Sequence, residues 1–169
     1  NGDPLRRYPL AYERTIDRAT MHLLHYALLG VMEEGTGASL APLLPADLVT
    51  AAKSGTSDDG RDSWFAGFSG DLLTVTWVGF DDNRASSLTG TRGAGQIWAR
   101  FMAQEARRSV AYRMPEKVEY KWIDATNGRK TGRGCPNAQR IPFIEGSAPT
   151  ANTDCRKTDN PVRDWLQKV

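Results

Sequence analysis

A cation and three hydroxyl groups lie close together between residues 53 and 57, and these side chains are the best suited in the chain to bind a ligand. The five residues are Lys53, Ser54, Gly55, Thr56 and Ser57. An ammonium group beside hydroxyl donors suits a carboxylate or amide ligand, and a glycine lets a ligand approach the backbone. The apolar residues before Lys53 predict a strand over Leu48–Ser57. At a sheet edge, such a strand can also pair with an extended peptide.

A second lysine-hydroxyl-glycine triplet occurs at Lys130, Thr131 and Gly132. It lies in a glycine-rich basic loop, and no strand pattern precedes it. Three residues of common types recur by chance, so the triplet alone carries little weight. We interpret the first copy as the binding element and the second as a coincidence.

The histidines and cysteines do not form a metal-binding pattern. His22 and His25 lie in an apolar helical segment, far from Cys135 and Cys155. A zinc site needs four ligands that the chain can bring together, so we predict no metal and no other cofactor. The two cysteines instead predict a disulfide, which indicates an oxidising compartment.

Two helices are expected to hold the strand in place. Leu23, Ala27 and Val31 recur four residues apart beside a second apolar row, which predicts a core-facing helix over Ile16–Glu34. Gly35 is expected to end this helix in a left-handed conformation. Apolar residues at positions 97, 98, 101 and 102 predict a second helix over Gly95–Arg108.

Two further strands are predicted over Ser63–Phe68 and Leu72–Phe80. Ser69-Gly70-Asp71 joins them as a tight hairpin, so they are expected to be antiparallel neighbours. Trp64, Phe65 and Trp77 are interpreted as core residues on the sheet face. The predicted fold class is α+β: an antiparallel sheet packed with an N-terminal and a C-terminal helix.

Composition limits the remaining possibilities. The chain has 169 residues and a formal net charge of +2, so we expect no basic surface for nucleic acid. The apolar stretch Leu23–Met32 is too short to span a membrane. Residues 110–169 are polar, with a strand-like stretch at Lys117–Ile123 and a possible helix at Pro161–Val169. We therefore divide the chain into a domain at 1–109 and an irregular, disulfide-bearing tail at 110–169.

An ordered series of short motifs resembles one family, the class A bifunctional penicillin-binding proteins of bacterial cell-wall synthesis. The series is Gly35-Thr36-Gly37, Lys53-Ser54-Gly55-Thr56-Ser57, Asp62-Ser63-Trp64-Phe65-Ala66-Gly67, Val75-Thr76-Trp77-Val78-Gly79 and Gly93-Ala94. It resembles the end of a transpeptidase domain, and the tail resembles a C-terminal extension of some Gram-negative members. Ser54 stands where the family usually has threonine, which keeps the hydroxyl.

The resemblance implies a part of a peptidoglycan synthase at the periplasmic face of the bacterial inner membrane. The family cross-links peptidoglycan stem peptides through an acyl-serine intermediate, polymerises glycan strands and is inhibited by β-lactams. By this resemblance Lys53 and Thr56 would bind the carboxylate of the stem peptide or β-lactam, and Ser54 would line the site. Residues just after Gly55 would lie on the strand that supplies an oxyanion donor.

The catalytic motifs of the family are absent from this chain. No lysine has a serine three residues before it, and no asparagine has a serine two residues before it. We therefore expect a fragment without its nucleophile, which associates with the remainder of its parent chain or with itself. The alternative is a non-catalytic module that binds a cell-envelope protein or glycan.

The missing nucleophile leads to a first prediction. This chain alone should form no covalent adduct with penicillin, because no serine in it lies in the Ser-x-x-Lys motif that would be acylated. Intact-mass measurement after incubation with penicillin tests this expectation. A stoichiometric penicilloyl mass increment on the chain would contradict it.

Overall fold

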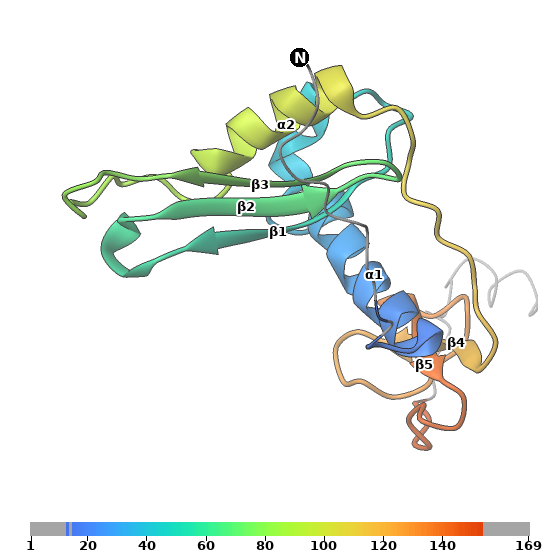
Figure 1. The fold of residues 1–169 in the computed structure, drawn as a ribbon. Coiled ribbons are helices and arrows are strands. Elements are labelled where there is room, and N and C mark those ends of the chain that lie inside the picture. Colours follow the sequence, from blue (N-terminus) through green and yellow to red (C-terminus); the bar gives the residue numbers. More distant parts are fainter. Residues whose placement is uncertain (1–12, 14, 154–169) are drawn as a thin grey trace, which may run out of the picture.

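The structure is a computed structural model that describes residue 13 and residues 15–153. In this part of the chain, helices α1 (Arg18–Glu33) and α2 (Ala94–Glu105) accompany two antiparallel sheets (Figure 1). Two short 3₁₀ helices, η1 (Ala38–Leu43) and η2 (Asp58–Gly60), lie between the longer elements. The predicted α+β class, with a helix before and a helix after the first sheet, is confirmed.

The first sheet contains the predicted ligand-binding strand at one edge. Its strands are β1 (Ala51–Thr56), β2 (Ser63–Phe68) and β3 (Leu73–Val78), in the order β1-β2-β3 with both pairs antiparallel. The predicted hairpin between the last two is confirmed, because the Ser69 N–H donates to the Leu72 carbonyl over 2.8 Å. In the described residues, β1 pairs with β2 alone, so its other edge is open.

Helix α2 covers one face of this sheet and forms the core with it (Figure 1). The Trp98 ring is fully buried, and its centroid lies 4.9 Å from that of Phe65. A Cβ atom on Gly67 would lie 2.5 Å from the Trp98 ring, so the glycine makes room for the indole. Leu40 of η1 and Met32 of α1 close the same cluster.

The opposite face of the sheet is open, contrary to the predicted core role of Trp64 and Trp77. These side chains are 46% and 43% exposed, and Leu73 and Val75 beside them are also exposed. Side chains alternate between the two faces of a strand, and α2 covers only the face that carries Phe65. The prediction was therefore right for Phe65 and wrong for the two tryptophans.

Helix α1 begins at the capping carboxylate of Asp17 and does not end as predicted. The Asp17 carboxylate accepts hydrogen bonds from the N–H groups of Ala19 and Thr20 at 2.9 and 3.0 Å. At the other end Gly35 does not adopt a left-handed conformation. Its N–H donates to the Gly30 carbonyl, and a Cβ there would lie 2.8 Å from the Val31 Cα. Glycine is therefore required at position 35 because a side chain would clash with Val31, and not because the backbone has a positive φ.

The described part of the tail, residues 110–153, contains a sheet, which corrects the predicted irregular structure there. β4 (Val118–Asp124), close to the expected strand-like stretch, pairs with β5 (Ala138–Ile144) in a second antiparallel sheet. β5 was missed because it is polar and contains Pro142, which normally argues against a strand. The predicted helix at 161–169 and Cys155 lie outside the described residues.

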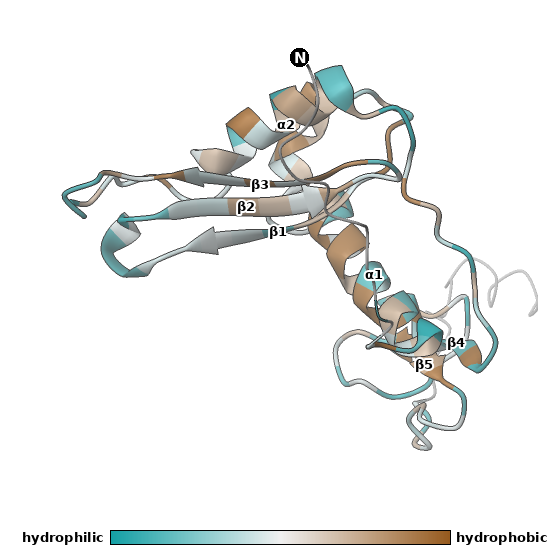
Figure 2. Cartoon of the chain, viewed as in Figure 1, coloured by the Kyte–Doolittle hydropathy of each residue, from teal (hydrophilic) through white to brown (hydrophobic). Residues whose placement is uncertain are grey.

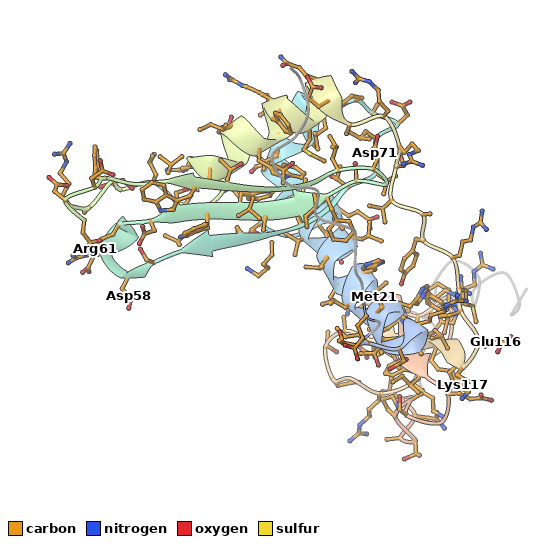
Figure 3. All side chains as sticks on the ribbon, in the orientation of Figure 1. Met21, Asp58, Arg61, Asp71, Glu116 and Lys117 are labelled. Atoms are coloured by element: carbon orange, nitrogen blue, oxygen red, sulfur yellow. The ribbon has the colours of Figure 1, made fainter. Side chains whose placement is uncertain are left out.

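Helix α1 connects the two sheets (Figures 1 and 2). Its C-terminal half reaches the first core through Met32, and its N-terminal half packs on the tail through His22. Met21 and Lys117, labelled in Figure 3, mark this second contact region. His22 Nε2 lies 2.9 Å from the Tyr120 hydroxyl, and the His22 ring stacks on Tyr112 at 4.1 Å.

Two predicted absences concern membranes and metals. No helix in the described residues is long and apolar enough to cross a membrane. The same part of the chain contains no group of three or more potential metal-ligating side chains.

The buried position of His22 makes the contact between α1 and the tail sensitive to acid. Burial lowers the pKa of His22 below its ordinary value. A hydrogen bond with the Arg113 backbone partly opposes this effect by raising the pKa, and the charge of His25 lowers the pKa by a smaller amount. A folded-state pKa below the unfolded value means that the unfolded chain binds more protons as the pH falls below about 6.5. We therefore expect stability to be highest above that pH and to decrease as the pH falls toward the folded pKa.

An NMR titration of the two histidine rings tests this prediction, with the His22 midpoint expected below 6.5. The free energy of unfolding, measured between pH 8 and 5, should fall less in His22→Gln than in the unaltered chain. His25→Gln serves as the matched control, because it removes the other histidine of α1. A His22 midpoint at or above the ordinary histidine value would contradict the prediction.

Candidate ligand-binding edge

The register of the first sheet separates the predicted ligand-binding residues onto two faces. Lys53 pairs with Ala66 and Gly55 with Trp64, which places both on the open face. Ser54 pairs with Phe65, and Thr56 pairs with Ser63, on the face covered by α2. A single ligand can therefore meet both Lys53 and Thr56 only along the edge of the strand.

The backbone of β1 offers hydrogen-bonding groups along that edge. The Ser57 N–H donates to the Asp62 carbonyl over 3.1 Å, so this pair is of the hydrogen-bonded type. In an antiparallel ladder such pairs alternate with non-hydrogen-bonded pairs, whose N–H and C=O groups point away from the partner strand. The N–H and C=O groups of Ala52, Ser54 and Thr56 therefore point away from β2 and toward the open edge.

The Lys53 side chain reaches this edge from the open face. Its Nζ donates a hydrogen bond to the Ser54 carbonyl oxygen over 2.7 Å. Because that carbonyl points to the open edge, the bond places the ammonium there as well. Lys53 is exposed, and no carboxylate in the described part of the chain forms a salt bridge with it. The edge therefore carries an uncompensated positive charge.

The hydroxyl groups of Ser54 and Thr56 are held from the other face. Ser54 Oγ lies 3.0 Å from the hydroxyl of Thr36, in the turn that follows α1. Thr56 Oγ1 accepts a hydrogen bond from the backbone N–H of Gly90 over 3.0 Å. The segments after α1 and before α2 thus fix two of the predicted ligand-binding side chains.

Ser57 directly follows β1 and bonds across the turn to Asp62. Its Oγ accepts a hydrogen bond from the Asp62 N–H over 2.7 Å, next to the turn marked by Asp58 and Arg61 in Figure 3. The Trp77 indole N–H donates to the Asp62 carboxylate over 2.9 Å. This bond and one from the Ser57 side chain lower the pKa of Asp62, so the carboxylate stays ionised.

The second lysine-hydroxyl-glycine triplet has a different setting. Lys130 forms isolated bridges with Ile123 and Asn152 at the second sheet, and no named strand contains it. The Thr131 hydroxyl oxygen is buried and has no hydrogen-bond partner among residues 13 and 15–153. These features match the interpretation that residues 130–132 do not repeat the geometry of residues 53–57.

Two residues of this region were not predicted as ligand-site residues. The sequence indicates Thr36 only as part of a family motif, and it does not point to Gly90. Both touch β1 through single hydrogen bonds from segments distant in sequence. Local sequence carries no signal for such contacts, because they depend on how α1 and α2 pack against the sheet.

Comparisons with known proteins agree with the resemblance. No protein-family model matches the chain. It is 29% identical to penicillin-binding protein 1B of Vibrio cholerae over 164 residues, or 92% of this chain and 19% of that protein. It is 37% identical to penicillin-binding protein 1B of Haemophilus influenzae over 153 residues, or 85% of this chain and 19% of that protein.

A solved structure shows the same relation in three dimensions. The crystal structure of penicillin-binding protein 1A from Haemophilus influenzae matches with a TM-score of 0.72 at 27% sequence identity. The match covers 82% of this chain and 22% of that one. The chain thus spans about a fifth of the length of these relatives.

The fold and the sequence matches together define a part of a penicillin-binding protein. The chain belongs to the class A penicillin-binding proteins, the family that includes the 1A and 1B proteins. The similarity also extends beyond residue 109. Residues 1–109 make up about 64% of the 169 residues, whereas the Vibrio cholerae match covers 92% of the chain and so must include part of residues 110–169. Part of the tail is therefore also similar in sequence to this relative.

Proposed function

We propose that this chain is part of a peptidoglycan synthase, in which it supplies the strand that binds the donor stem peptide. The whole protein would cross-link stem peptides by D,D-transpeptidation through an acyl-serine intermediate, and would also polymerise glycan strands. The observation that carries the proposal is the open edge of β1 in the described residues, where the Lys53 ammonium donates to the Ser54 carbonyl and has no carboxylate partner. β-Lactams would bind at the same edge.

Carboxylate binding follows from the charge and the hydroxyls of this edge. The terminal carboxylate of a stem peptide, or the carboxylate of a β-lactam, would exchange with the Ser54 carbonyl as the partner of Lys53 Nζ. Thr56 would donate its hydroxyl proton to the same group. Hydrogen bonds between charged partners are stronger than neutral ones, so this pair would set the register of the ligand.

The reacting carbonyl would lie beside the backbone of the same strand. The Thr56 N–H points toward the open edge, and a backbone N–H there can stabilise the negative charge that develops on a carbonyl oxygen during acyl transfer. The nucleophilic serine would come from the rest of the longer protein, since this chain has no Ser-x-x-Lys motif. No cofactor is needed for this chemistry.

The open face of the sheet supports a place within a larger assembly. Trp64 and Trp77 lie together on it, with ring centroids 6.3 Å apart, and Leu73 is 75% exposed beside them. Apolar side chains gathered on a surface favour a packing partner. We infer that the rest of the parent protein, or a second copy of the chain, covers this face at the periplasmic side of the inner membrane.

Lys53 provides the direct test of this function. In the full-length protein, Lys53→Ala should slow acylation by penicillin, because a charge-assisted contact typically contributes ~1.5–3 kcal/mol, or roughly one to two decades in rate. The measurement is the second-order rate constant for labelling by a fluorescent penicillin. The free energy of unfolding should not change, since Lys53 is exposed.

Lys130→Ala is the matched control, because it removes the lysine of the second triplet, and it should acylate at the unaltered rate. Equal effects of the two substitutions would contradict the choice of binding strand. A full-length protein that takes up no penicillin label would instead favour the alternative, a non-catalytic module that binds an envelope protein or glycan.

A disulfide between Cys135 and Cys155 remains part of the proposal. The described residues contain no free cysteine, and Cys155 lies outside them. Closing a loop of this size would stabilise the native state by about 3 kcal/mol in the chain-entropy account. Peptide mapping without reductant should therefore recover one linked pair from protein folded under oxidising conditions. Two free thiols in that protein would contradict the bond and the periplasmic location argued from it.

A further inference from the structure

We propose that Gly90 is a positioning residue that orients the Thr56 hydroxyl as a hydrogen-bond donor to the ligand carboxylate. This inference rests on the proposed function of β1 and extends it to the turn before α2. Gly90 is buried, and Thr56 is exposed. The only hydrogen bond of the Thr56 side chain in the described residues comes from the Gly90 N–H, over 3.0 Å.

The direction of this bond decides what Thr56 can do. A hydroxyl group has one proton to donate and two lone pairs that accept. Because the Gly90 N–H occupies a lone pair, the proton of the hydroxyl stays available for another acceptor. If a carbonyl oxygen stood in place of the Gly90 N–H, the Thr56 hydroxyl would donate its proton to that carbonyl and could not donate it to a ligand. The turn thus holds Thr56 as a donor, which is the role that a carboxylate ligand requires.

Buried hydrogen bonds hold the turn in place. The Gly95 N–H donates to the Gly90 carbonyl over 2.7 Å at the start of α2. Ser63 Oγ, fully buried in β2, donates to the Thr89 carbonyl over 2.8 Å and accepts from the Ala94 N–H over 2.9 Å. The Gly90 N–H is therefore fixed relative to the sheet by both β2 and α2.

No side chain fits at position 90. A Cβ atom there would lie 2.7 Å from the Trp64 carbonyl oxygen, 2.8 Å from the Gly55 carbonyl oxygen and 2.9 Å from the Ser54 Cβ. Two of these contacts are backbone atoms of paired strands, which cannot move without breaking the sheet. A substitution must therefore push the turn away from β1 and lengthen the bond to Thr56.

The test compares two ligands in the full-length protein: penicillin, which has a free carboxylate, and its methyl ester, which lacks the charge. Gly90→Ala should slow acylation by penicillin about tenfold and leave acylation by the ester nearly unchanged. Gly134→Ala is the matched control, because a Cβ there meets nothing within 4 Å. A purely structural role of Gly90 would slow both ligands equally, and that result would overturn the inference.

Three further variants keep the test decisive if Gly90→Ala does not fold. Ser63→Ala removes the buried hydroxyl that anchors the turn, and it should reduce the preference for penicillin over the ester. Thr56→Ser should keep that preference, and Thr56→Val should lose it. Unchanged preference in Ser63→Ala would overturn the inference.

Lys53→Ala separates this inference from the function on which it rests. If Lys53→Ala slows acylation by penicillin while Gly90→Ala does not, the inference fails and the function of the strand stands. If neither substitution has an effect, the proposed function of β1 fails as well.

Discussion

An unpaired strand edge is the constraint on which the arrangement of this molecule depends. Among the described residues, β1 pairs with β2 on one side only, and the antiparallel ladder directs every second N–H and C=O group of β1 to the free side. The same ladder sends Lys53 and Thr56 to opposite faces of the sheet. A ligand that is to meet both has one available position, along the edge itself. The part of the chain that the structure describes leaves that edge open, while α2 covers one face of the sheet.

The supports of this edge come from three separate segments. The turn after α1 contacts Ser54 through Thr36, the turn before α2 contacts Thr56 through Gly90, and Asp62 contacts Ser57. Each contact uses the side-chain hydroxyl of a residue from 54 to 57. The strand is therefore held on its covered side and at its end, and its free side stays accessible. An edge strand can pair with a strand of another chain, and the exposed charge of Lys53 disfavours such pairing.

Helix α1 links this edge to the second sheet. Its C-terminal half packs Met32 into the core under β1, and its N-terminal half places His22 between Tyr112 and Tyr120. The tail is thus docked on the same helix whose last turn precedes Thr36. This packing agrees with sequence matches that extend over both regions of the chain.

The sequence by itself determined the two α-helices and the three strands of the first sheet. These depend on periodicity and turn residues within a few positions, such as the row from Leu23 to Val31 and the Ser69–Asp71 hairpin. The order of short motifs also indicated the family. Tertiary structure decided the rest. Trp64 and Trp77 have the same apolar character as Phe65, and only the position of α2 determines which of them is buried. The role of Gly90 likewise depends on a contact between residues 34 positions apart in sequence. Periodicity describes which side chains share a face, but which face is covered depends on elements that local sequence does not place.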